Sequence, residues 1–262
     1  LAVHKGEIIY DKAFGNFEYK QSPQMTTESI FDLASVTKIS ATTISIMKLF
    51  EEGKLDLNKT LGDYLPYTRG TDKAPLRIDD ILLHEAGLVS FISFYKETID
   101  PVSCVPRQEI YSNKMKAPYT VRVADNLYLR NDWKDTLMSR ILKSPLGPAH
   151  KYVYSDNDFI FLGKIVEQIS GMPLNEYVEK NFYSKLGMTT TGFKPRARFA
   201  VDQIVPTEEE KNFRRQLIHG DVHDEGASMF GGVAGHAGLF SDAYDLAKLY
   251  QMLLNGGEYN GV

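Results

Sequence analysis

A series of amphipathic segments, each ended by glycine or proline, most constrains the fold of this chain. Apolar residues recur at helical spacing from Ser35 to Glu52, and Gly53 is placed to end that helix. The same pattern predicts helices at residues 78–85, 132–143, 158–170 and 175–186. Residues 1–15 instead predict two strands with a turn at Lys5 and Gly6. The sequence therefore predicts an α/β fold whose middle is mostly helical.

We expect one catalytic domain built from two parts. Residues 1–45 and 190–262 are predicted to form a sheet-containing α/β part, and residues 46–189 a mostly helical region, with a cleft where the two meet. The chain ends in a predicted turn, "NGGEYNGV". We therefore expect further sheet strands to lie beyond Val262.

Composition and charge exclude several classes of partner. A chain of 262 residues that is 43% hydrophobic and 24% charged has the balance of a globular protein. Its net charge of -4 gives no electrostatic reason to expect a nucleic acid as partner. No apolar run approaches the roughly 20 residues of a membrane span, so no span is expected in this chain. The single cysteine, Cys104, excludes an internal disulfide and is interpreted as a structural thiol.

The pattern Ser-x-x-Lys occurs three times, beginning at Ser35, Ser45 and Ser93. Only Ser35 lies at the start of a predicted helix, where free backbone N–H groups and the helix dipole stabilise negative charge. Lys38 follows three residues later on the same face, so its amine can reach the Ser35 hydroxyl. A neutral amine in that position could accept the hydroxyl proton, and burial together with the dipole would favour the neutral form.

A purely structural interpretation of the same pair stays open. Serine is a good helix N-cap, and Lys38 could be a solvated surface residue. However, a cation in the first turn opposes the helix dipole by roughly 0.3–1 kcal/mol, whereas a capping box would place Glu or Gln there. A locally unfavourable residue of this kind is typical of a functional site.

Tyr154 is a second candidate, at the junction between a loop and the helix predicted from Asp158. A tyrosine in such a position can face a cleft, and beside a lysine it could relay a proton to a leaving group. The alternative is a tyrosine packed in the core beside Tyr152.

Four stretches together resemble one known family. In chain order they are "FDLASVTK", "LLHEAGL", "YSDNDFIFLGKIVEQISG" and "GGVAGHAGLFSDAYDLAKL". Over nearly the whole chain they are similar to the serine β-lactamase and penicillin-binding protein superfamily, above all to its class C-like branch of β-lactamases, D-amino acid peptidases and esterases. The resemblance implies a β-lactamase/transpeptidase-like fold, an antiparallel sheet flanked by helices with an inserted helical region. It also implies a serine hydrolase of the bacterial periplasm or cell envelope.

The resemblance assigns roles to particular residues. Ser35 would be the acylated nucleophile, Lys38 its partner base, and Tyr154 the first residue of the Tyr-x-Asn element that moves the proton. The third position of that element is Asp156, where the family commonly has Asn, so an amide is replaced by a carboxylate that only accepts hydrogen bonds. Asn157 could substitute for it, and both residues are substrate-binding candidates. The implied substrate is a β-lactam, a D-amino acid peptide or an ester, small or derived from peptidoglycan, and no cofactor or metal is implied.

The family also has a Lys-Thr-Gly or His-Thr-Gly strand across the cleft. His236 begins a similar stretch, but Ala237 lacks the hydroxyl and residues 242–254 predict a helix where the family has strands. We expect the third element beyond Val262, which leaves the activity of this fragment open.

Two other functions compete with the hydrolase. The stretch "HGDVHDEGA" offers His219 and His223 as ligands of a metal-dependent hydrolase, although Gly220 argues against one helix presenting both. The other alternative is a non-catalytic module of the same fold that binds cell-wall peptides or a partner protein.

Overall fold

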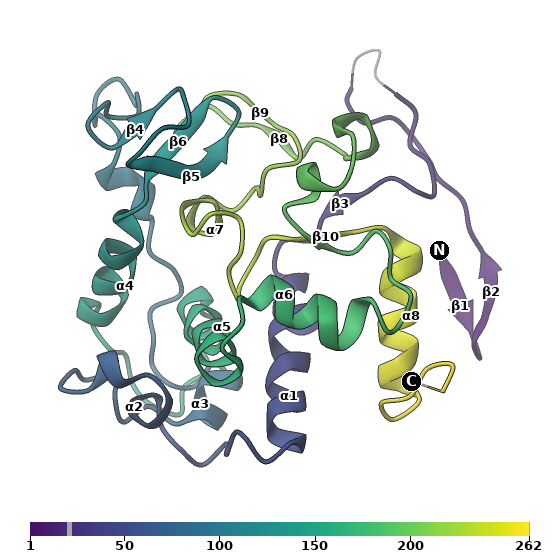
Figure 1. The fold of residues 1–262 in the computed structure, drawn as a ribbon, viewed down its shortest axis with the longest axis horizontal. Coiled ribbons are helices and arrows are strands. Elements are labelled where there is room, and N and C mark those ends of the chain that lie inside the picture. The colour runs from purple at the N-terminus through teal and green to yellow at the C-terminus, as the bar shows by residue number, and fades with distance from the viewer. Residues whose placement is uncertain (20–22, 262) are drawn as a thin grey trace.

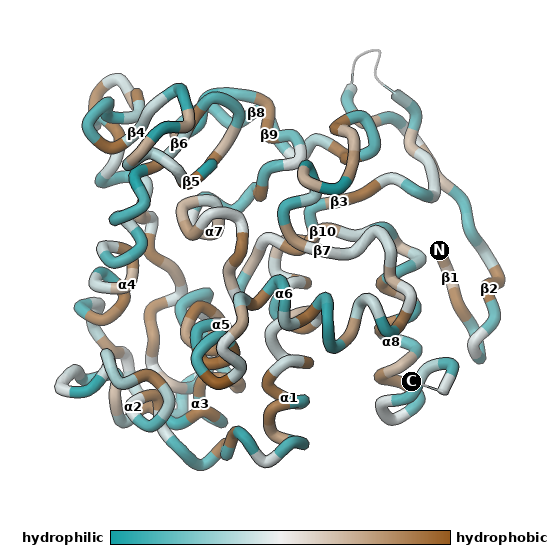
Figure 2. Tube along the Cα trace, in the orientation of Figure 1, coloured by the Kyte–Doolittle hydropathy of each residue, from teal (hydrophilic) through white to brown (hydrophobic). Residues whose placement is uncertain are grey.

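Three helical segments form the centre of the molecule. The computed structural model describes residues 1–19 and 23–261. A π-helical segment, Lys38–Thr43, runs directly into α1 (Ile44–Glu51). The π-helical segment packs against α5 (Asp156–Ser170) and α6 (Leu174–Val178), and α1 packs against α5. Figure 1 shows α1, α5 and α6 in the middle of the molecule. Apolar residues concentrate on α1 and α5 (Figure 2).

Helix α5 is the central element because other helices surround it. Its N-cap is Ser155, whose side chain accepts hydrogen bonds from the backbone of Asn157 and Asp158. Gly171, with φ of 68°, ends it in the left-handed conformation that glycine adopts freely. The helices α1, α2 (Leu61–Tyr64), α3 (Ile78–Leu82) and α6 all contact it. The prediction of a helix at 158–170 is confirmed, and the cap starts it two residues earlier.

The other predicted helices are also present. The segment 35–52 is helical but contains a π-helical stretch, a feature frequent at functional sites. Residues 132–143 form α4 (Trp133–Lys143), and 175–186 form α6 followed by a π-helical segment, Glu179–Tyr183. The helix predicted at 78–85 is shorter and ends at Leu82. Residues 242–254 form α8 (Ala243–Leu254), as predicted.

A short antiparallel sheet connects the start and the end of the chain. It consists of β3 (Phe31–Asp32), β10 (Leu239–Ser241) and β7 (Gly192–Phe193), in the order β3-β10-β7. Phe240 pairs with Asp32 on one side and with Gly192 on the other. The strand β3 ends just before the helical segment of Lys38, so this sheet places that helix start.

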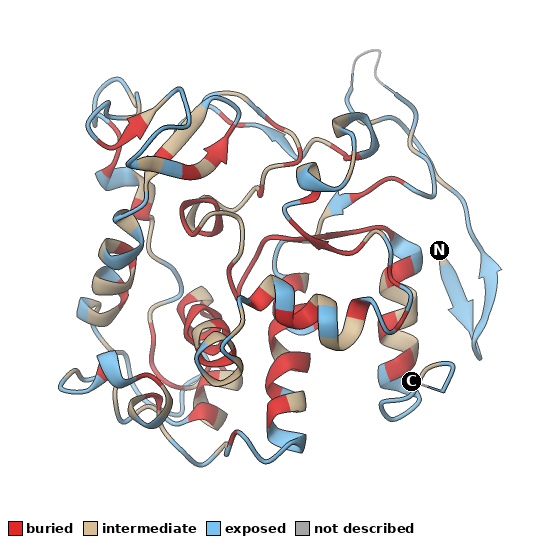
Figure 3. Ribbon diagram, in the orientation of Figure 1, coloured by how far each residue is buried: buried red, intermediate tan, exposed pale blue. Residues whose placement is uncertain are grey.

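The predicted N-terminal hairpin is confirmed. Strands β1 (Ala2–His4) and β2 (Glu7–Tyr10) pair antiparallel around Lys5 and Gly6. Every residue of both strands is exposed, and Figure 3 shows the hairpin exposed at the edge of the molecule. Ile9 is 65% exposed, so its side chain contributes little to the core formed by the described residues.

The middle of the chain contains a sheet that sequence analysis did not predict. Strands β4 (Tyr111–Ser112), β6 (Leu127–Arg130) and β5 (Tyr119–Ala124) form it, in that order. The strand β5 packs against α7 (Glu225–Met229), and a separate pair, β8 (Glu208–Glu209) and β9 (Leu217–Ile218), lies before α7 in the chain. The fold is therefore mixed α/β with antiparallel sheets, as predicted, while the division at residues 46 and 189 stays a prediction.

No helix among residues 1–19 and 23–261 is long and apolar enough to cross a membrane.

The glycine-rich loop, residues 231–238, packs against α5 and gives a stability prediction. A Cβ on Gly235 would lie 1.9 Å from the Phe159 carbonyl oxygen, so Gly235→Ala must push α5 and the loop apart. We expect a loss of at least about 2 kcal/mol in the free energy of unfolding, measured by urea denaturation. In the control Gly147→Ala, the new Cβ meets nothing closer than 3.5 Å, and its effect should stay within about 0.5 kcal/mol. Equal stability of the two variants would contradict the close contact.

Candidate active site

Ser35 lies in a tight turn between β3 and the π-helical segment. The Asp32 side chain accepts a hydrogen bond of 2.8 Å from the Ala34 backbone, and Ala34 has a φ of 44°, unusual for a residue with a side chain. The other Asp32 oxygen accepts 2.7 Å from the His223 backbone. Burial raises the pKa of Asp32, and these two backbone hydrogen bonds oppose it. The turn leaves Ser35 exposed at the start of the helix.

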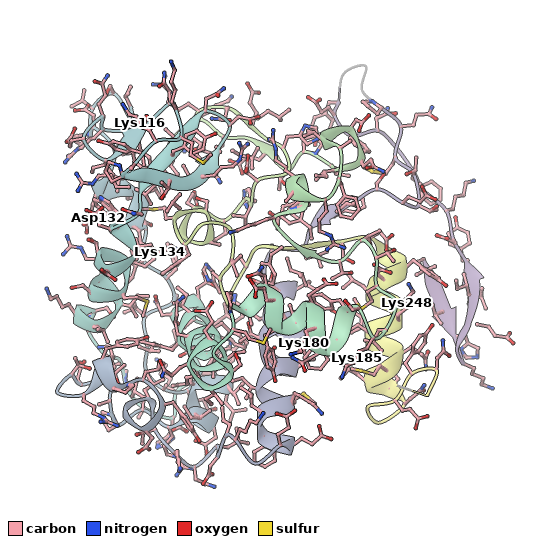
Figure 4. All side chains as sticks on the ribbon, viewed as in Figure 1. Lys116, Asp132, Lys134, Lys180, Lys185 and Lys248 are labelled. Carbon is pink, nitrogen blue, oxygen red and sulfur yellow. The ribbon has the colours of Figure 1, made fainter. Side chains whose placement is uncertain are left out.

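Lys38 is buried and binds three acceptors. Its Nζ donates to Ser35 Oγ at 3.0 Å, to Asp156 Oδ1 at 2.6 Å and to the His236 carbonyl at 3.2 Å. Lys38 is only 3% exposed. Four of the lysines labelled in Figure 4 are, in contrast, exposed: Lys116, Lys134, Lys180 and Lys185. The structure therefore brings Ser35 and Lys38 together as predicted, and Lys38 is not a solvated surface residue.

Lys38 forms an ion pair with Asp156. A carboxylate at 2.6 Å stabilises the ammonium form, because opposite charges attract strongly where water is excluded. The sequence argument expected a neutral amine and did not include this carboxylate. Lys38 is therefore held by an ion pair as well as by its contact with Ser35.

The ring of Tyr154 lies close to the Lys38 amine. Its ring centroid lies 4.8 Å from Lys38 Nζ and 4.6 Å from the His84 ring. The residue is 44% exposed, so it is not a core tyrosine. Its hydroxyl has no hydrogen-bond partner in the part of the chain that the structure describes, which leaves it available to a ligand in the cleft.

Asp156 and Asn157 have different surroundings. Asp156 points to Lys38, as given above, whereas Asn157 is 1% exposed and its Nδ2 donates to the Val89 carbonyl at 2.8 Å. The Asn157 amide is therefore bound to the backbone, whereas Asp156, at the third position of the predicted element, contacts Lys38. Ser155 caps α5 and donates to the same Val89 carbonyl, so its hydroxyl is already engaged in structural hydrogen bonds.

A buried pair formed by His84 and Asp158 lies behind Tyr154. Asp158 Oδ2 is 2.6 Å from His84 Nδ1, and the Ser155 backbone donates to the same nitrogen at 3.1 Å. Burial raises the pKa of Asp158 to about 6, although the hydrogen bond to His84 opposes this shift.

A second pair, formed by His236 and Asp224, lies on the other side of Lys38. His236 Nε2 is 2.9 Å from Asp224 Oδ1, and His236 is 2% exposed. Burial alone would raise the pKa of Asp224, but the hydrogen bond from His236 outweighs it and holds the pKa well below its usual range. Sequence analysis missed both pairs, because it used "LLHEAGL" only for the family resemblance and considered "HGDVHDEGA" only as a source of metal ligands.

The histidines of the metal-site alternative bind elsewhere. His219 Nε2 contacts the Ile204 carbonyl at 2.5 Å, and His223 Nε2 contacts Glu208 at 2.6 Å. The structure does not bring His219 and His223 together in a group of potential ligands. Within the described ranges, one such group is found, at Asp80, Glu85 and His150.

A cavity of about 330 Å³ adjoins Lys38. Asp156, Asn157, Asp224, Glu225 and His236 are among its lining residues. A larger cavity of about 610 Å³ lies between β5 and the loop after β7 and contains none of the predicted catalytic residues. The smaller cavity is therefore the one that belongs to the candidate active site, because two of its lining residues, Asp156 and His236, bind the Lys38 amine.

These features, a serine at a helix start and a buried lysine beneath it on a mixed α/β fold, define the class of β-lactamase and transpeptidase-like proteins. The profile of the Beta-lactamase family matches residues 1–261, and the chain belongs to that family. The family resemblance and the fold class predicted from the sequence are thereby confirmed.

Relatives agree with this assignment. The chain is 38% identical over 291 residues to the "Putative D-alanyl-D-alanine carboxypeptidase" of Salmonella schwarzengrund (strain CVM19633), an alignment that covers 100% of this chain and 61% of that protein. The chain thus spans about three fifths of the length of this relative.

Solved structures share the fold at lower identity. The octameric penicillin-binding protein homologue from Pyrococcus abyssi matches with a TM-score of 0.69 and 24% identity, over 97% of this chain and 51% of that one. A class C β-lactamase from Rhodobacter sphaeroides matches with a TM-score of 0.59 and 18% identity, over 94% and 57%. D-amino acid amidase from Ochrobactrum anthropi matches with 0.63 and 17%, over 93% and 61%.

The raised pKa of Asp158 gives a pH-dependent stability prediction. Asp158 binds a proton more tightly in the folded state, so its contribution to stability is complete below about pH 4 and is lost as the pH rises through about 6. Asp158→Asn keeps a neutral group there at every pH. Relative to wild type, the variant should gain up to about 3 kcal/mol between pH 4 and pH 6.5 in urea denaturation. A difference independent of pH would show that Asp158 is ionised in the folded protein.

Proposed function

We propose that this chain is the acylating part of a serine hydrolase in which Ser35 forms an acyl-enzyme with an amide or ester substrate. The observation that carries the proposal is the 3.0 Å contact between Lys38 Nζ and the exposed Ser35 hydroxyl. Nucleophile and base within hydrogen-bond distance, with the base oriented by a third group, is the arrangement of covalent catalysis. Here Asp156 and the His236 carbonyl orient the base.

The proposed reaction has two steps. Neutral Lys38 takes the proton of Ser35, whose oxygen attacks the substrate carbonyl. The phenol of Tyr154 gives its proton to the leaving group and receives the proton held by Lys38, so both side chains return to their starting forms. The Ser35 backbone N–H has no acceptor among residues 1–19 and 23–261, so it is free to donate to the developing oxyanion. Water then releases the acyl group.

The substrate class follows from the relatives. A D-alanyl peptide of peptidoglycan is the proposed acyl donor, because a relative at 38% identity is described as a "Putative D-alanyl-D-alanine carboxypeptidase". The carbonyl carbon of a β-lactam or an ester would be attacked by the same serine. The bacterial cell envelope is the corresponding location.

Covalent labelling tests the nucleophile. A fluorophosphonate probe should form a bond between Ser35 Oγ and phosphorus with loss of fluoride, seen by intact-protein and peptide mass spectrometry. Ser35→Ala should abolish the label, and the control Ser45→Ala should retain it, because the Ser45 hydroxyl is buried on the Ala41 carbonyl. Absence of any label in wild type would favour the non-catalytic binding module instead.

The role of Asp156 is tested by restoring an amide. Asp156→Asn removes the carboxylate that stabilises the ammonium form of Lys38 at 2.6 Å. The charged amine then loses its ionic partner, so the fluorophosphonate labelling rate at pH 7 should rise above that of wild type. Glu97→Gln, which removes an exposed carboxylate bound to Arg140, should leave the rate unchanged. An unchanged rate in Asp156→Asn would contradict this role of the Asp156–Lys38 pair.

A further inference from the structure

The segment 84–90 lies along the segment that carries Tyr154. It follows α3, which packs against α5. Backbone N–H groups of residues 147–156 donate to its carbonyls at 2.7–2.8 Å: Gly147 to Gly87, His150 to Glu85, Val153 to His84 and Asp156 to Ser90. The stretch "LLHEAGL", which the proposed reaction does not use, is therefore bound to the loop that leads into the candidate active site.

Within this contact, His84 binds the residues on both sides of Tyr154. The His84 carbonyl accepts a hydrogen bond from the Val153 N–H at 2.8 Å, and its Nδ1 accepts one from the Ser155 N–H at 3.1 Å. The ring centroids of His84 and Tyr154 are 4.6 Å apart, with the planes tilted by 51°. His84 is only 8% exposed, and the Phe159 ring lies 5.3 Å from it. One buried residue thus contacts the ring of Tyr154 and the backbone before and after it.

Tyr154 itself has few other contacts that fix its side chain. It is 44% exposed, and its hydroxyl has no hydrogen-bond partner among residues 1–19 and 23–261. Exposed side chains exchange rapidly between rotamers unless they pack against a fixed group. The ring of His84 is such a group. Because proton transfer requires heavy atoms within about 2.6–3.2 Å, a phenol that leaves its place transfers its proton poorly.

We propose that His84 is a positioning residue that holds the Tyr154 phenol where it can give its proton to the leaving group. The inference rests on the proposed acyl transfer at Ser35, in which Tyr154 is the proton donor. Without the His84 ring, substrates whose leaving group must be protonated are cleaved more slowly. Substrates whose leaving group departs as a stable anion do not need the phenol proton, so their cleavage is affected less.

Two esters of one acid test the role of His84. The methyl ester of N-acetyl-D-alanine releases methoxide, a strong base that requires a proton, whereas the p-nitrophenyl ester releases a stable phenolate. His84→Asn removes the ring, but Asn tolerates the left-handed φ of 60° at this position and keeps an acceptor for the Ser155 N–H. The ratio of kcat/KM for the methyl ester to kcat/KM for the p-nitrophenyl ester should fall at least about tenfold.

A double variant shows whether His84 acts through Tyr154. Tyr154→Phe alone should also lower the ratio at least about tenfold, because the donor is absent. Adding His84→Asn to Tyr154→Phe should then change the ratio by less than about twofold. The matched control is His150→Asn, in the same segment. His150 also has a left-handed φ, of 57°, but its side chain is 72% exposed, so the ratio should stay unchanged.

The ratio is the readout because a smaller folded fraction lowers both rates together. Equal losses for the two esters in His84→Asn overturn the proposal, since they indicate a purely structural residue. A further fall of the ratio when His84→Asn is added to Tyr154→Phe overturns it as well. Both results leave the fluorophosphonate labelling of Ser35 in place. If wild type is not labelled at Ser35, the proposed function fails, and the role of His84 fails with it.

Discussion

The site depends on one buried cation. Taking the Lys38 ammonium out of water costs several kcal/mol unless its protons are bound, and the structure supplies acceptors from Ser35, Asp156 and His236. These acceptors belong to a turn, the start of α5 and the glycine-rich loop, so the same amine that faces the serine also connects three segments. The fold must bring all three to one point, because a lysine buried without them would be strongly destabilising.

Asp156 changes the chemistry that the family pattern implies. An Asn at that position would leave the lysine without an ionic partner, whereas a carboxylate stabilises its charged form. The two histidine–carboxylate pairs differ from each other. Burial raises the pKa of Asp158 beside His84 to about 6, whereas the hydrogen bond from His236 outweighs burial and holds the pKa of Asp224 well below its usual range.

The surface of the N-terminal hairpin contrasts with this tightly connected centre. Its strands pair with each other and are exposed throughout, whereas most of α5 is buried (Figure 3). Local strand propensity and the turn at Lys5 and Gly6 are sufficient for the pairing. The hydrogen-bond partners of Lys38 given above are not residues of the hairpin.

Local patterns were enough to predict the helices and the Ser35–Lys38 pair. Helical periodicity, glycine stops and a three-residue spacing act within a few residues, so they can be read without a fold. The sheet of β4, β5 and β6 was missed because short strands with charged residues such as Arg122 carry a weak pattern. The charge of Lys38 could not be predicted either. Its partners lie 118 and 198 residues away, and only tertiary packing brings Asp156 and His236 to the amine and removes the water between them.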